Sequence, residues 1–264
     1  MNFMKRIQTI AAFLVVFALA GMGSLKAAEP GTIQGKAIVR SVTGNATYTA
    51  NGVTLPLKPN MQLDPGATIS TGPESVVYLS VNGLTSAVRV QADTTLVIPQ
   101  MDRIGAAREG DTQTQLELKL GTILGQVQKI SANSTYEIKT PHGVAGIRGT
   151  DYGIVVTQEA NGQYVVTFTS ISGLVIVSAV VDNNVQTRNL HDGESWTPGS
   201  GDVHPTPLDM LNEWKADLGQ MNIPTLPPPS VPILQPFPTG GTPTGVPSGQ
   251  QPSSPNSVVT GAAN

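Results

Sequence analysis

Three Asn-Gly pairs constrain this chain most, because each separates two segments of β-type sequence. The pairs are Asn51-Gly52, Asn82-Gly83 and Asn161-Gly162. Both residue types tolerate the positive φ that the common two-residue hairpin turn requires. Residues 46–50 and 53–57 are therefore predicted to pair around the first turn, and residues 75–81 and 84–90 around the second.

The remaining sequence up to about residue 203 also predicts short strands. Every second residue from Leu116 to Leu120 is leucine, and Glu117 and Lys119 lie between them, so one strand face would be apolar and the other charged. Residues 99–112 are charged and contain glycine, which predicts a long loop. Further strands are predicted at residues 67–71, 95–98, 122–129, 135–139, 153–157, 164–169, 174–180 and 185–190.

Aromatic side chains are scarce, so the core must consist mainly of Val, Ile and Leu. After residue 28 the phenylalanines are Phe168 and Phe237. Narrow layers of aliphatic side chains suit short strands that stack closely. Residues 29–203 are therefore predicted to form one mainly β domain of stacked short strands, either a β-solenoid or a flattened sandwich. The sequence has no strict repeat that decides between the two.

Residues 1–28 have the pattern of a secretory signal peptide. Lys5 and Arg6 precede an uncharged apolar stretch, and the small residues Ala27 and Ala28 follow it. We expect an exported protein, in the periplasm or outside the cell, with no membrane span once the signal is cleaved. The chain has no cysteine, which excludes disulfides and thiolate metal sites.

Cleavage of this signal would remove three basic side chains and no acidic one. Twelve basic side chains then remain beside 18 acidic ones, and the net charge falls from −3 to about −6. This charge argues against general nucleic-acid binding.

Residues 204–219 predict an amphipathic helix. Thr206 could cap its N-terminus, Pro207 suits its first position and Gly219 would end it. The apolar side chains on one face are Leu208, Leu211, Trp214 and Leu218. This face could dock on the β domain or bind a partner. Docking is the preferred interpretation, because a lone helix of this length is only marginally stable in water.

Residues 220–264 hold 11 of the 21 prolines and no charged side chain. Such a segment buries too little apolar area to offset its ordering entropy. We predict a disordered, Pro-rich tail that acts as a spacer or as a ligand for a proline-binding domain.

Residues 140–152, here called the hallmark segment, read Thr-Pro-His-Gly-Val-Ala-Gly-Ile-Arg-Gly-Thr-Asp-Tyr. A Thr-Pro pair, a glycine, then Ile-Arg-Gly-Thr and an aromatic residue resemble the hallmark of FecR domains. The matching positions are Thr140, Pro141, Gly143, Ile147, Arg148, Gly149, Thr150 and Tyr152. The resemblance implies cell-surface signalling, in which an exported domain receives a signal and a cytoplasmic anti-sigma region passes it on. Because the apolar stretch begins almost at the first residue, we expect the exported domain without the cytoplasmic region.

Candidates for catalysis or metal binding are few. The histidines are His142, His191 and His204. No two of them are spaced along the chain as the ligands of a metal site usually are. The sequence has neither a Gly-x-Ser-x-Gly elbow nor a phosphate-binding glycine loop of the Gly-x-x-x-x-Gly-Lys type. We therefore expect no enzyme activity, no cofactor and no metal. Carboxylates that meet only in the folded chain would escape this test.

Arg148 has two interpretations. Its guanidinium carries five donors and could tie strand-end carbonyls, or Asp151, into a locked turn between two layers. Alternatively, it presents a contact for a partner protein or an anionic ligand. The structural role is the preferred interpretation.

Two functions agree with these features. The first is a protein–protein interaction module of the bacterial cell envelope, acting in cell-surface signalling, whose exposed strand edges pair with an envelope protein partner. The alternative is a structural or adhesive envelope protein that has no signalling role.

Overall fold

The computed structural model describes residues 31–82, 86–105 and 111–221. Within these ranges the chain forms eighteen strands and one helix, α2 (Leu208–Gly219). The signal peptide predicted at residues 1–28, and residues 222–264 of the predicted tail, lie outside the described residues. The strands are β1 (Thr32–Gln34), β2 (Ala37–Thr43), β3 (Ala46–Ala50), β4 (Val53–Pro56), β5 (Gln62–Leu63), β6 (Thr68–Thr71), β7 (Val76–Val81), β8 (Ser86–Val90), β9 (Thr95–Ile104), β10 (Asp111–Val127), β11 (Thr135–Lys139), β12 (Gly143–Ile147), β13 (Asp151–Gln158), β14 (Tyr164–Ser172), β15 (Val175–Val181), β16 (Asn184–Leu190), β17 (Glu194–Trp196) and β18 (His204–Pro205).

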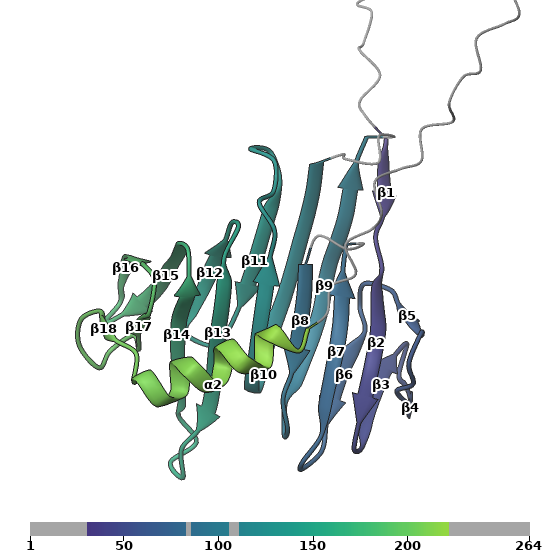
Figure 1. Ribbon diagram of the computed structural model, residues 1–264, viewed down its shortest axis with the longest axis horizontal. Coiled ribbons are helices and arrows are strands. Elements are labelled where there is room, and N and C mark those ends of the chain that lie inside the picture. Colours follow the sequence, from purple (N-terminus) through teal and green to yellow (C-terminus); the bar gives the residue numbers. More distant parts are fainter. Residues whose placement is uncertain (1–30, 83–85, 106–110, 222–264) are drawn as a thin grey trace, which may run out of the picture. The chain divides into compact units, whose positions relative to one another are not determined.

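The strands form two sheets that share one core (Figure 1). Sheet A has the order β4-β3-β6-β9-β10-β11-β12-β15-β16, and β1 pairs with the C-terminal end of β9. Sheet B has the order β5-β2-β7-β8-β10-β13-β14-β17-β18. The buried core is mainly aliphatic and draws side chains from both sheets. This confirms the predicted mainly β fold of stacked short strands.

Strand β10 belongs to both sheets. Its first half pairs with β9 and β11 in sheet A, and its second half pairs with β8 and β13 in sheet B. The chain passes between the sheets at Gly121, where φ is +93°. A Cβ at Gly121 would collide with Thr94, whose hydroxyl accepts the backbone N–H of Thr122 at 2.9 Å. The bend therefore requires glycine at this position.

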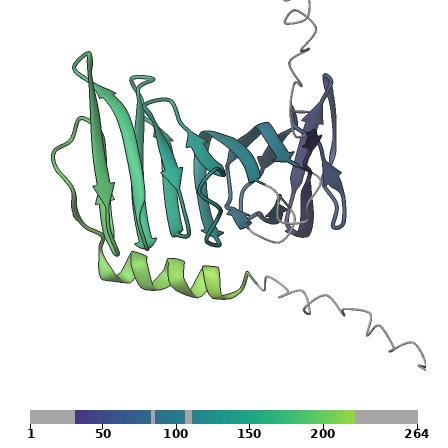
Figure 2. The ribbon, with the colours of Figure 1, turned by 90° about the horizontal axis from the view of Figure 1, so that it is seen from above.

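Helix α2 lies along the outer face of sheet B (Figure 2). Trp214 packs over Gly153 of β13, where a Cβ would collide with the indole ring. Asp217 forms an ion pair with Arg89 of β8 and accepts a hydrogen bond from Gln91 at 3.5 Å. The preferred interpretation, docking on the β domain, is confirmed. The buried apolar side chains of this contact are Leu211, Trp214, Leu218 and Met221 on the helix side and Ala87, Leu124 and Ile171 on the sheet.

The predicted helix start at residue 204 is wrong, because His204 and Pro205 form β18 and α2 begins at Leu208. Thr206 does not cap α2, because its buried hydroxyl lies 2.6 Å from the hydroxyl of Ser195, which also bonds that of Thr169 at 2.7 Å. Pro207 occupies the cap position without a side-chain hydrogen bond. Leu208 does not join the apolar face either, since it is 74% exposed. Tertiary hydrogen bonds to β17 outweigh the local capping preference of Thr206.

The Asn-Gly pairs form different turns. Asn51 (φ 51°) and Gly52 (φ 77°) make the predicted two-residue turn between β3 and β4. At the second pair the predicted register of the two strands is wrong, because Val81 pairs with Ser86; Gly83 of this pair lies outside the described residues. The loop at the third pair is also longer, with residues 159–163 between β13 and β14. A two-residue turn that was not predicted lies at Asp182-Asn183, where φ is 51° and 61°.

The long loop predicted at residues 99–112 is wrong at both ends, because β9 continues to Ile104 and β10 begins at Asp111; residues 106–110 lie outside the described residues. Pro99 fits inside β9 because the register with β10 shifts there: Gln100 pairs with Gln115 but Val97 pairs with Glu117. Such a bulge tolerates a residue without a backbone N–H. The predicted apolar face of β10 also ends early, since Leu120 is 37% exposed.

We predict that the Trp214–Gly153 contact holds α2 on sheet B. Trp214→Ala should lower the free energy of unfolding by about 3–5 kcal/mol, because it removes a large buried side chain. Gly153→Ala should destabilise the native protein but cost less in the Trp214→Ala background, where the colliding ring is absent. Urea denaturation of the two single variants and the double variant measures this coupling. Additive effects would contradict the contact.

Candidate functional site

The hallmark segment spans both sheets. It leaves β11 at a turn, forms β12 in sheet A, crosses to sheet B at residues 148–150 and enters β13. The strands predicted from the sequence did not include β12. Its short side chains hid the β pattern, yet β12 pairs with β11 on one side and with β15 on the other.

The turn at residues 140–143 is closed by Thr140. Its backbone N–H and its hydroxyl both donate to the Gly143 carbonyl at 2.9 Å, and its hydroxyl accepts the Gly143 N–H at 3.1 Å. Pro141 and His142 project from this turn and are exposed. A Cβ at Gly143 would lie 2.8 Å from the Ser178 carbonyl oxygen, so β12 approaches β15 this closely only with glycine there.

The crossing at residues 148–150 is held by Thr150. Its buried hydroxyl donates to the Leu174 carbonyl at 2.9 Å, and its own carbonyl accepts the Val127 N–H at 3.0 Å. Gly149 has φ +68°, and a Cβ there would lie 3.3 Å from the Cα of Lys129. Thr150 thus links its own crossing to the chain segments at Val127 and Leu174, where the chain also passes between the sheets. This is the locking role that was predicted for Arg148.

Arg148 itself is exposed, and it forms no hydrogen bond or ion pair with any residue of the described chain. The preferred structural role is therefore wrong. Asp151, its expected partner, instead accepts a hydrogen bond from the Ser172 hydroxyl at 3.1 Å. The physical reason is that Thr150 already bonds the Leu174 carbonyl at this crossing. Arg148 remains available as a five-donor cation on the surface.

Tyr152 and Ile147 anchor the segment in the core. Tyr152 is fully buried, its ring fills the space above Gly125, and its hydroxyl lies 3.4 Å from that of Tyr136. Burial raises the pKa of Tyr136 to about 12 and holds the pKa of Tyr152 well above 10. A buried phenol ionises reluctantly because the anion loses its hydration.

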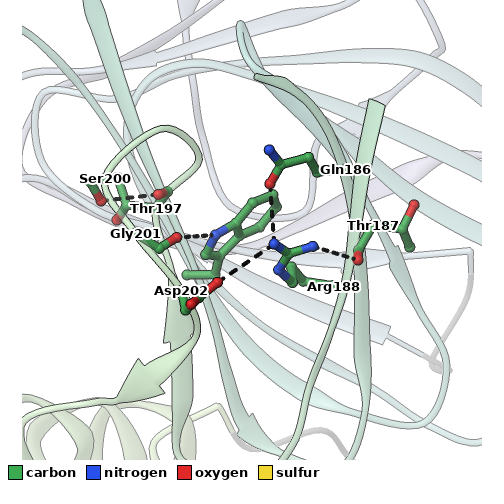
Figure 3. A network of polar contacts seen from close by, with 8 residues as sticks. Gln186, Thr187, Arg188, Thr197, Ser200, Gly201 and Asp202 are labelled. Carbon is green, nitrogen blue, oxygen red and sulfur yellow. Dashed lines mark hydrogen bonds and ion pairs between the residues drawn. The ribbon is translucent and has the colours of Figure 1, made fainter. Parts of the chain in front are cut away.

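A second cation, Arg188 of β16, lies in a network of polar contacts (Figure 3). Its guanidinium donates to Gln186 at 3.2 Å and to the Thr187 carbonyl at 3.3 Å, and it lies 3.6 Å from Asp202. The same group lies 5.4 Å from the ring centre of the fully buried Trp196. This network covers the core beside β17, so its role is structural.

The described residues offer no group of three or more His, Asp or Glu side chains arranged to hold a metal ion. The three histidines lie in separate places. His142 lies in the turn at residues 140–143 (the hallmark turn), His191 lies before β17, and His204 lies in β18. No helix in residues 31–82, 86–105 and 111–221 has the length and apolarity to cross a bilayer.

Comparison with known proteins supports the resemblance. The family model "FecR protein" matches residues 67–172, from the strand β6 region to the end of β14, and includes the whole hallmark segment. The chain therefore carries a FecR domain over these residues. Strands β1–β5, β15–β18 and helix α2 lie outside the match but pack on it.

Two crystal structures of a candidate anti-sigma factor from Parabacteroides distasonis ATCC 8503 are similar to this chain. The TM-scores are 0.41 and 0.42, both at 14% sequence identity. Each alignment covers 56% of this chain and 63% or 64% of the other, so this chain spans less than two thirds of those proteins. No curated protein matches the chain.

We predict that Thr150 stabilises the crossing and that Arg148 does not. Thr150→Val should lower the free energy of unfolding by about 1–3 kcal/mol, because it removes the donor to the buried Leu174 carbonyl. Arg148→Ala should change it by no more than about 0.5 kcal/mol, as is usual at exposed positions. Urea denaturation of both variants measures the difference, and a larger loss in Arg148→Ala would restore the locking role to the arginine.

We also predict a loss of stability in alkali. Both buried tyrosines have folded-state pKa values above the unfolded value of about 10. Their contribution is complete below pH 10 and is lost as the pH rises towards the folded pKa of Tyr136, about 12. Tyr136→Phe should flatten the pH dependence of the melting temperature in this window. Tyr164→Phe is the control, since Tyr164 is 37% exposed, and an equal effect in it would contradict the prediction.

Proposed function

We propose that this chain is an exported protein-binding module of the bacterial cell envelope that acts in cell-surface signalling. The FecR domain at residues 67–172 supports the signalling role, since the family resemblance implies it. The signal-peptide pattern of residues 1–28 supports export. The absence of cysteine agrees with a fold that needs no oxidising machinery in its compartment.

The observation that carries the proposal is the exposed Arg148. Four of the other hallmark positions have a structural role: Thr140 closes a turn, Thr150 joins the sheets, and Ile147 and Tyr152 are buried. Arg148 sits among them without a polar partner in the described chain. A rigid crossing that holds a free guanidinium is suited to bind a carboxylate or strand-end carbonyls of another protein.

The test is cross-linking in living cells, followed by purification of the tagged chain and mass spectrometry. The wild type should recover one receptor or membrane regulator, and Arg148→Ala should lose it. Arg40→Ala is the matched control, because Arg40 is also exposed, lies in β2 and is outside the hallmark segment. Recovery of the same partner by Arg148→Ala would refute the proposed contact. Recovery of wall fragments or of this chain alone would favour the structural or adhesive function.

A further inference from the structure

The two sheets differ in what covers their outer faces. Sheet B carries α2, whereas no described element covers the outer face of sheet A beside β15 and β16. Three apolar side chains on this face are exposed to solvent: Ile176 is 44% exposed, Val180 59% and Val185 75%. Val180 and Val185 are direct cross-strand partners, so they form one apolar ridge. A cluster of exposed apolar side chains of this kind marks an interaction surface.

A hollow of about 350 Å³ lies beside this ridge. Val144, Val180 and Val185 form its apolar wall, and the hallmark turn with Pro141 and His142 forms one end. The hallmark segment therefore helps to build this hollow at the start of β12, whereas Arg148 follows the other end of the same strand. The two features are separate surfaces.

Charge complementarity indicates what the hollow binds. Lys139 and Glu117 both line it and are neighbours in the β10–β11 register, but Glu117 forms its ion pair with Lys119. The side chain of Lys139 has no ion pair or hydrogen bond with any described residue, and neither has the side chain of His142. Glu117, Lys119 and Lys139 together carry one net positive charge, and Lys139 is the cation among them that lines the hollow beside the apolar wall.

We propose that this hollow binds a segment of a partner protein in which an apolar side chain adjoins a carboxylate. The apolar side chain would pack on Val180 and Val185, and the carboxylate would pair with Lys139. Residues 222–264 of this chain contain no acidic side chain, so they offer no side-chain carboxylate for this pairing. The inference rests on the protein-binding function proposed above and names a second surface for it.

The test uses the full chain, isotopically labelled, and NMR titration with the capped dipeptide acetyl-leucyl-aspartyl amide. We expect shifts at the methyl groups of Val144, Val180 and Val185. Lys139→Glu should weaken binding by about fivefold, the factor expected for an exposed ion pair. Lys58→Glu is the control for net charge, because Lys58 is exposed and lies elsewhere. Val185→Ser should also weaken binding, whereas Val53→Ser, at a valine that is 57% exposed on β4, should not.

Several outcomes would overturn the inference. They are no shift at the hollow, equal weakening by Lys58→Glu and Lys139→Glu, and equal binding of the acetyl-leucyl-asparaginyl probe. Shifts that depend on protein concentration without any probe would identify a second copy as the occupant instead. Arg148→Ala should bind the probe as the wild type does. If Arg148→Ala alone loses the cellular partner and the probe does not bind, the proposed function stands and this inference fails.

Discussion

Close approach of the backbone, where the chain passes between its two sheets, is the constraint on which the rest of the structure depends. Gly121 lets β10 bend from sheet A into sheet B against Thr94. Gly149 allows the next passage to lie on Lys129, and a Cβ at Gly173 would lie 3.0 Å from the Gly149 carbonyl oxygen. Because successive passages touch, the strands of each sheet stack in register and enclose one aliphatic core.

The hallmark segment combines this constraint with a surface. Its threonines and glycines fix the turn and the crossing, and its buried side chains hold β12 and β13 in the core. The rigid frame leaves Arg148 exposed at one end of β12 and the hallmark turn exposed at the other. The segment thus combines residues that define the fold with residues that are exposed on its surface.

The outer faces of the two sheets differ in their exposure to solvent. Trp214 and the Arg89–Asp217 ion pair fasten α2 to sheet B and remove that face from solvent. Sheet A keeps an apolar ridge and a hollow with a cation at its rim. One face is therefore covered by α2, and the other is the face on which we propose recognition.

The sequence by itself determined the fold class, the first hairpin and the apolar face of α2, because alternation, Asn-Gly turns and helical spacing are local signals. It also located the hallmark segment and its FecR resemblance. Only the tertiary structure decided that Thr150 locks the crossing and leaves Arg148 free, that Thr206 bonds Ser195 rather than capping α2, and that β9 continues through Pro99. Each of these outcomes depends on a partner from another part of the chain, and local sequence carries no record of such a partner.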